Sequence, residues 1–129
     1  MPMPDADQQA MLAAPSPQVI LHAIAHPLRR KILGWLKDAI RYFPQQVYGR
    51  EFGVCAGQIV LRCGLAQSTV SQHLAVLKKA ALIEEHKIGP VHFFTRNEVT
   101  LQRFTHQLTG LLANPLIATI HQTDEHLPA

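Results

Sequence analysis

The sequence has few charged residues, few aromatic residues and almost no cysteine. Charged residues make up 16% of its 129 residues and aromatic residues 6%, and there are only two cysteines. Two cysteines cannot hold a small secreted fold together, so we expect free thiols and a cytoplasmic protein. No apolar run reaches the roughly 18 residues that a membrane-spanning helix needs. The first 14 residues contain Asp5 and Asp7 but no lysine or arginine, unlike the basic start of a signal peptide.

The motifs of enzymes are also absent. The chain has no P-loop, no pair of catalytic carboxylates and no Ser/His/Asp or Cys/His constellation, only scattered histidines. We therefore expect no enzymatic activity and no cofactor. Hydrophobic residues make up 47% of the chain, which is enough for a 14.4 kDa protein to bury the core of one domain.

The basic residues are concentrated in the middle of the chain. The formal net charge is +3, but all twelve lysines and arginines lie between residues 26 and 103. That part holds five acidic residues and has a net charge of +7, whereas each end carries two acidic residues and no basic one. This distribution is expected of a domain that binds the phosphates of nucleic acid. Chance clustering on a solvated surface would look the same, so charge alone leaves both interpretations open.

Helices are predicted in the first part of the chain. Ser16-Pro17 is typical of a helix start, because a hydroxyl can cap the first turn and proline fits its first position. His26-Pro27 interrupts this helix and begins a second one, with apolar residues every three or four positions. Residues 38–53 are predicted to be irregular. They hold half of the eight aromatic residues, so we expect part of this segment to pack against the core.

The second part of the chain adds two close helices, a hairpin and a last helix. Periodicity and turn residues predict helices at 56–63 and 67–80, strands at 82–88 and 91–96, and a helix from Asn97 to a break at Asn114-Pro115. The predicted fold is mainly α with a small β-hairpin, in the order α-α-α-α-β-β-α. We expect a flexible N-terminal tail at 1–15, one domain at 16–113 and a C-terminal tail at 114–129.

The helices at 56–63 and 67–80, with the glycine-containing turn between them, have the pattern of a helix-turn-helix. The second helix has an apolar face and a face of short hydrogen-bonding side chains. Those at its N-terminal end are Gln67, Ser68, Thr69, Ser71 and Gln72. Such side chains can reach base edges when a helix lies in the major groove of DNA. An ordinary surface helix is the alternative, but it would need neither this cluster nor the hairpin that follows.

The residues around this helix suggest contacts with the DNA backbone. Lys78 and Lys79 lie further along it, where they are placed for phosphates. The hairpin would form a wing, making this a winged helix-turn-helix. Lys87 and His92 near its tip could approach a neighbouring minor groove or phosphate.

Three stretches resemble the ArsR family of bacterial winged-helix repressors. Residues 25–33 (AHPLRRKIL) look like the family's opening helix, residues 63–83 (CGLAQSTVSQHLAVLKKAALI) like its recognition helix and the beginning of the wing, and residues 89–94 (GPVHFF) like its second wing strand. The resemblance covers about residues 17–112, and its most specific part is 67–77. It implies a homodimer that binds a palindromic operator and releases the DNA when an inducer binds.

The resemblance also implies roles for single residues. Gln67, Ser68, Thr69, Ser71 and Gln72 would face the major groove. His73 would lie near the phosphate backbone or be a packed histidine, and both interpretations stay open. Ala66 departs from the family, which usually has a capping serine or threonine there. A missing cap costs about 1 kcal/mol.

A dimer interface is predicted from the apolar residues of the last helix. Leu101, Phe104, Leu108 and Leu111 share one face and have little left to cover in so small a domain. A second copy could bury them together with apolar residues of the first helix: Val19, Ile20 and Ala23. Packing on the chain's own core is the alternative. We favour the dimer, because a two-fold protein that reads two half-sites needs such an interface.

The metal sites of the family are incomplete in this chain. Cys55 aligns with the first cysteine of the family's Cys-x-Cys motif, but Gly57 stands in place of the second, and a soft metal needs two or three thiolates. Cys63 is eight residues further on, about 12 Å along a helix, which is too far for one metal. The family's Asp-x-His pattern is missing too, since Phe104 replaces the aspartate before His106. His121 and His126 are expected to be solvent-exposed. We predict no metal site.

The cysteines are therefore the main candidates for the sensor. We hypothesise that Cys55, alone or with Cys63, responds to an oxidant or electrophile, because the helix start and the basic neighbours Arg50 and Arg62 favour a thiolate at Cys55. Two buried inert thiols are the alternative. A soft metal or metalloid inducer, an apolar ligand beside residues 42–52, and a winged helix that binds only proteins also stay open.

Overall fold

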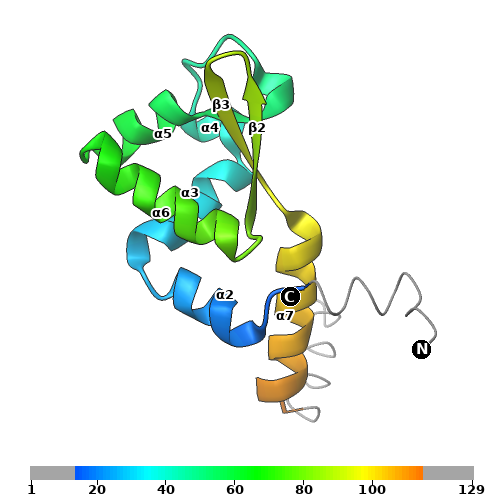
Figure 1. The fold of residues 1–129 in the computed structure, drawn as a ribbon. Coiled ribbons are helices and arrows are strands. Elements are labelled where there is room, and N and C mark those ends of the chain that lie inside the picture. Colours follow the sequence, from blue (N-terminus) through cyan, green and yellow to red (C-terminus); the bar gives the residue numbers. More distant parts are fainter. Residues whose placement is uncertain (1–13, 115–129) are drawn as a thin grey trace, which may run out of the picture.

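The computed structural model describes residues 14–114. Most of the two predicted tails, and with them His121 and His126, lie outside the described residues. The described part folds as a winged helix-turn-helix, with helices α2 to α7 and a three-stranded antiparallel sheet. In Figure 1, α7 extends below the sheet and helix-turn-helix, beside α2.

The first two helices begin where the sequence predicts. Helix α2 (Pro17–Ile24) follows Ser16, whose hydroxyl accepts a hydrogen bond from the backbone N–H of Val19. Helix α3 (Pro27–Lys37) follows His26, whose Nδ1 accepts a hydrogen bond from the N–H of Leu28 at 3.1 Å. The cap by His26 was not predicted. Both helices have proline in the first position, where no intrahelical donor is lost.

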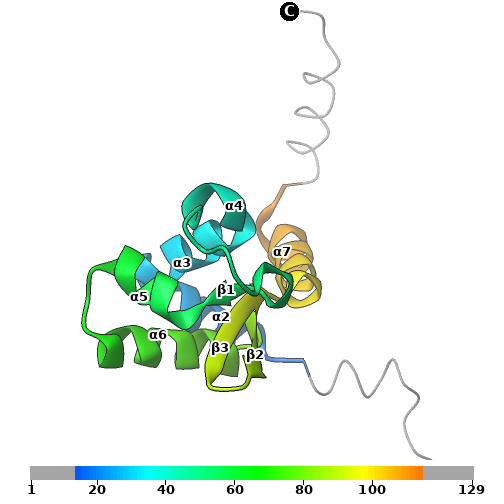
Figure 2. The ribbon, with the colours of Figure 1, turned by 90° about the horizontal axis from the view of Figure 1, so that it is seen from above.

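The helix-turn-helix consists of α5 (Ala56–Cys63) and α6 (Gln67–Lys79). Gly64 ends α5 in the left-handed conformation, with φ +67°, as expected of a glycine that terminates a helix. Ile59 of α5 and Val70 of α6 are fully buried, so the two helices share one core. Figure 2 shows α5 and α6 side by side, with the sheet next to them.

The sheet contains one strand that the sequence did not predict. Strands β2 (Ile83–Ile88) and β3 (Val91–Arg96) form the expected wing, and β1 (Val54–Cys55) pairs with the other edge of β3. A two-residue strand has no periodicity of its own. Its position depends on pairing with Phe93 and Phe94, which lie far along the chain. The wing is therefore attached directly to the start of α5.

Residues 38–53 are less irregular than predicted and pack in part. They contain the short helix α4 (Ala39–Tyr42) and the 3-10 turn η1 (Arg50–Phe52). Phe43 is buried, whereas Tyr48 is 77% exposed. Gly49 has φ +72°, and a Cβ there would lie 2.5 Å from the ring of Phe93. The close approach of this segment to the wing therefore requires glycine.

Helix α7 (Glu98–Leu112) begins where the sequence predicts, with Asn97 as its cap. The Asn97 side chain accepts a hydrogen bond from the N–H of Thr100 at 3.2 Å. On the face predicted to form a dimer interface, Phe104 is 6% exposed and belongs to the chain's own core, with Ile20 and Ala23 of α2. These three residues were wrongly assigned to an interface, because α2 packs against α7 within one chain.

Candidate nucleic-acid interface

The polar face of α6 is exposed and its apolar face is buried. Val70, Leu74 and Leu77 face the core. The exposed residues of the first turns are the predicted base-reading side chains: Gln67, Ser68, Thr69, Ser71 and Gln72. The periodicity of the helix separates the two faces, so five hydrogen-bonding side chains stand together where a major groove could receive them.

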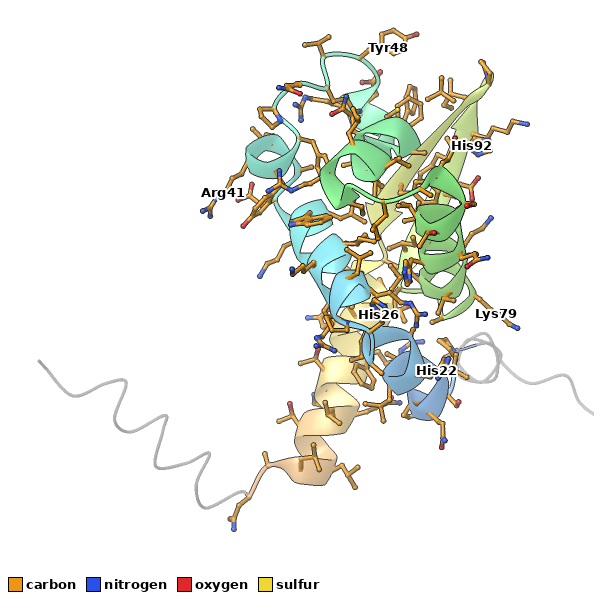
Figure 3. The ribbon with its side chains drawn as sticks, turned by 90° about the vertical axis from the view of Figure 1, so that its left-hand side faces the viewer. His22, His26, Arg41, Tyr48, Lys79 and His92 are labelled. Atoms are coloured by element: carbon orange, nitrogen blue, oxygen red, sulfur yellow. The ribbon has the colours of Figure 1, made fainter. Side chains whose placement is uncertain are left out.

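Basic residues lie along the same edge of the molecule. Lys79 is exposed at the end of α6, and Lys87 is exposed on β2 opposite His92 of β3. Figure 3 shows Lys79 and His92 at one edge, on either side of the exposed part of α6. This edge combines hydrogen-bonding groups with cations, as a surface that meets DNA must.

One carboxylate interrupts this basic edge. Glu85 of β2 accepts a hydrogen bond from Lys78 Nζ at 3.0 Å and also bonds the Nδ1 of His92. The hydrogen bond from Lys78, followed by that from His92, holds the pKa of Glu85 below its usual range. All three side chains line a groove of about 360 Å³ between α6 and the wing, together with Gln67 and Ser71. Lys78 thus forms an ion pair within the protein, and His92 shares the same carboxylate.

His73 is half-buried and bonded to other side chains of the described residues. Its Nδ1 accepts a hydrogen bond from Nε of Arg29 at 3.1 Å, and its ring lies 4.5 Å from that of His26. Burial, assisted by the charges of His26 and Arg29, lowers its pKa. Arg29 also donates to the carbonyl oxygens of His22 and Ala23, so α2, α3 and α6 meet at this arginine.

The two cysteines have different surroundings. Cys55 precedes α5, and its backbone N–H donates to the side-chain oxygen of Gln46 at 2.8 Å. It lines a groove of about 420 Å³ together with Gln67 and Ser71 of the recognition helix. Burial raises the pKa of the Cys63 thiol, which disfavours its thiolate. Residues 14–114 contain no group of three histidine, cysteine or acidic side chains that could hold a metal ion.

Sequence analysis missed Arg29, Glu85 and Gln46. Arg29 bonds a histidine that is 44 positions away, whereas Glu85 and Gln46 bond residues within nine positions but in other strands, helices or turns. Helical or strand periodicity reveals neither kind of contact. Gln46 is the one buried polar side chain among the described residues, and this burial is evident only in the structure.

A helix-turn-helix with an exposed polar recognition helix and an attached wing defines a winged helix-turn-helix DNA-binding protein. A family model described as "Bacterial regulatory protein, arsR family" matches residues 54–85. The chain is 34% identical over 84 residues to an uncharacterized HTH-type transcriptional regulator, YbzH of Bacillus subtilis (strain 168), in a match that covers 64% of this chain and 84% of the relative. It is 30% identical over 83 residues to the transcriptional repressor SdpR of the same organism, in a match that covers 64% of this chain and 78% of the relative.

A solved structure agrees with the fold. It is the homodimeric winged helix-turn-helix DNA-binding domain of a possible ArsR-family regulator from Mycobacterium bovis, with a TM-score of 0.53 at 21% identity, covering 99% of this chain and 94% of that one. The present chain belongs to the ArsR family of bacterial transcriptional regulators, which bind DNA and are not enzymes. Within residues 14–114, no helix is long and apolar enough to cross a membrane.

Proposed function

We propose that this protein is a cytoplasmic homodimeric repressor that binds a palindromic operator. The observation that carries the proposal is the exposed face of α6, where five hydrogen-bonding side chains stand on the helix that ends in Lys78 and Lys79. The relative SdpR is a repressor, which supports the direction of regulation. Gln67, Ser68, Thr69, Ser71 and Gln72 read bases. Lys79 and Lys87 contact the backbone, and Lys78 and His92 do so in competition with Glu85. His73 positions α6 through the hydrogen bond that it accepts from Arg29.

The homodimer is supported by apolar residues that the described chain leaves uncovered. Leu111 of α7 is 79% exposed, Leu112 is 70% exposed and Val19 of α2 is 42% exposed. Leu101 and Leu108 of α7 are half-buried at the edge of the core. A second copy that covers these side chains would place two recognition helices on one DNA duplex. The domain from Mycobacterium bovis is itself homodimeric.

The proposed signal is an oxidant or electrophile that reacts with Cys55. This thiol lines the same groove as Gln67 and Ser71, so an adduct on it would disturb the recognition helix. Cys63 is less suited to react, because its pKa is raised. Cys55→Ser should abolish operator release by peroxide or quinone, and Cys63→Ser should preserve it. Release that is the same in both variants would contradict the assignment, and release by arsenite alone would favour a metalloid inducer.

The experiment that tests DNA binding is selection of bound sequences from a random duplex pool, followed by titration of the selected site at several salt concentrations. We expect a two-fold symmetric site and an affinity that falls steeply with salt, since released counterions drive the binding. A module that binds only proteins would select no sequence and have no salt-dependent affinity for DNA.

A further inference from the structure

A groove on the side away from the recognition helix combines two arginines with an apolar wall. It has a volume of about 320 Å³, within the range of small-molecule sites. Helices α3 and α4 supply one side, and β1 and β3 supply the other; Figure 2 shows these elements with the start of α7 nearby. The apolar side chains that line it are Leu36, Ala39, Ile40, Val54 and Phe94. Arg50 and Arg96 line it too, and Glu98 is the one acidic side chain among its lining residues.

Arg50 has guanidinium N–H donors that remain available to a ligand. One terminal nitrogen donates to the carbonyl oxygen of Phe43. No carboxylate of residues 14–114 lies within 4.0 Å of this guanidinium as an ion-pair partner. A guanidinium with open donors beside an apolar wall matches a carboxylate that carries an apolar substituent.

Arg96 is held more tightly than Arg50. It donates to the carbonyl oxygen of Leu33 in α3 at 3.2 Å and to Glu98 at 3.2 Å. Its Nε lies 2.8 Å from the other Glu98 oxygen, so both oxygens of this carboxylate face the guanidinium. A carboxylate in the groove would compete with Glu98 for this guanidinium.

The same groove is connected to the helix-turn-helix through Gln46. This side chain lines the groove and is 6% exposed. Its amide nitrogen donates to the carbonyl oxygens of Tyr48 and Gly53, and its oxygen accepts the N–H of Cys55 at the start of α5. An occupant of the groove would therefore act on α5 through Gln46, and on the junction of β3 and α7 through Arg96.

We propose that this groove binds a small amphipathic carboxylate, an organic acid with an aromatic ring or short alkyl chain. Its carboxylate pairs with Arg50 and competes with Glu98 for Arg96, while its apolar part covers Ile40, which is 77% exposed at the groove. This inference rests on the proposed function, because such an acid would serve as an inducer of operator release.

The test begins with ligand binding to the full-length, DNA-free protein. Benzoate, phenylacetate and octanoate are titrated by NMR, with benzamide as the neutral counterpart of benzoate. We expect saturable binding of at least one acid, with the largest shifts at residues that line the groove, and binding of the amide at least about tenfold weaker. Absence of saturable binding by all three acids up to about 10 mM, or equal binding of benzoate and benzamide, would overturn the proposal.

Variants locate the site. Arg50→Met should weaken binding of the acid at least about tenfold. Lys37→Met, which removes an exposed cation outside the groove, should leave it unchanged. If Arg50→Met does not fold, Ile40→Glu tests the same site from an exposed position, where the new carboxylate should repel the acid. Unchanged binding in the folded groove variants would overturn the assignment.

Operator binding is measured separately, first without ligand. If the protein binds its operator but binds no acid, only the proposal of a ligand site in the groove is overturned. If the protein does not bind an operator, the proposed function is overturned and the ligand measurements still stand. With a bound acid, we expect operator affinity to fall about fivefold or more. An unchanged operator affinity would overturn the role as inducer.

Discussion

Arg29 Nε donates a hydrogen bond to His73 Nδ1 over 3.1 Å, which joins the start of α3 to the middle of the recognition helix. The acceptor nitrogen must be unprotonated, and the lowered pKa of His73 agrees with this. The position of the recognition helix therefore depends on a neutral histidine.

The first prediction concerns the pH dependence of stability. Because the pKa of His73 is lower in the folded state than its ordinary value of 6.5, the neutral ring stabilises the fold above that pH. This stabilisation is lost as the pH falls below 6.5 towards the folded pKa. The unfolding free energy of the wild-type protein should fall between about pH 7 and pH 5, and that of His73→Gln should fall less, as measured by urea denaturation at each pH. His106→Gln, at an exposed position of α7, should keep the wild-type dependence, and an unchanged slope in His73→Gln would refute the prediction.

The second prediction concerns the cap of α6. Ala66 has an extended backbone and makes no side-chain cap hydrogen bond. Ala66→Ser should stabilise the protein by about 1 kcal/mol, because a hydroxyl can accept an N–H of the first turn. Ala75→Ser, at an exposed position inside the same helix, should be slightly destabilising. Urea denaturation measures both, and an equal effect of the two serines would argue against capping.

The third prediction concerns the carboxylate within the basic edge. Glu85→Gln removes the negative charge that pairs with Lys78 and His92. DNA affinity should rise about tenfold at low salt, and the salt slope should steepen by about one, because Lys78 becomes available to a phosphate. Glu84→Gln, at the exposed neighbouring position, should have a smaller effect. The idea fails if Glu85→Gln weakens binding or leaves the slope unchanged.

The fourth prediction separates base reading from backbone contact. Gln72→Ala or Ser68→Ala should cost about 1–3 kcal/mol on the selected operator and relax its base preference. Lys79→Met should weaken binding to all sequences alike and lower the salt slope by about one. Competition binding with single-base operator variants distinguishes the two classes, and a uniform loss in Gln72→Ala would count against direct reading.

The fifth prediction concerns assembly. Leu111→Glu places a charge on the exposed apolar end of α7 and should convert a dimer into a monomer. Val47→Glu changes an even more exposed apolar residue, 93% accessible, in the segment before η1 and should leave the assembly unchanged. Sedimentation velocity measures both. A Leu111→Glu protein that remains dimeric would show that this part of α7 does not form the interface.

The helices and the exposed polar face of α6 were predictable because their determinants are local. Ser16 and Pro17 mark the start of α2, Gly64 ends α5, and the spacing of Val70, Leu74 and Leu77 separates the two faces of α6. Each of these features depends on neighbours within a few turns of the same helix. The wing strands were predictable for the same reason, since Gly89-Pro90 marks their turn.

Contacts between separate elements could not be predicted from such local features. Phe104 has the same helical spacing as Leu111, yet it is buried in the core whereas Leu111 is exposed. Strand β1 exists only because β3 pairs with it, and Gln46 is buried only because Tyr48, Gly53 and Cys55 surround its amide. Periodicity indicates that a face is apolar, but not which element covers it.

The sequence by itself therefore determined the helix-turn-helix, the wing and the exposed hydrogen-bonding face of α6, because hydrophobic periodicity, caps and turn residues act over a few positions. The tertiary structure alone decided that Arg29 holds His73, that Glu85 neutralises Lys78, and that Arg50 and Arg96 share a groove. Those relationships join residues from separate elements, and only the packing of the whole domain brings these residues together.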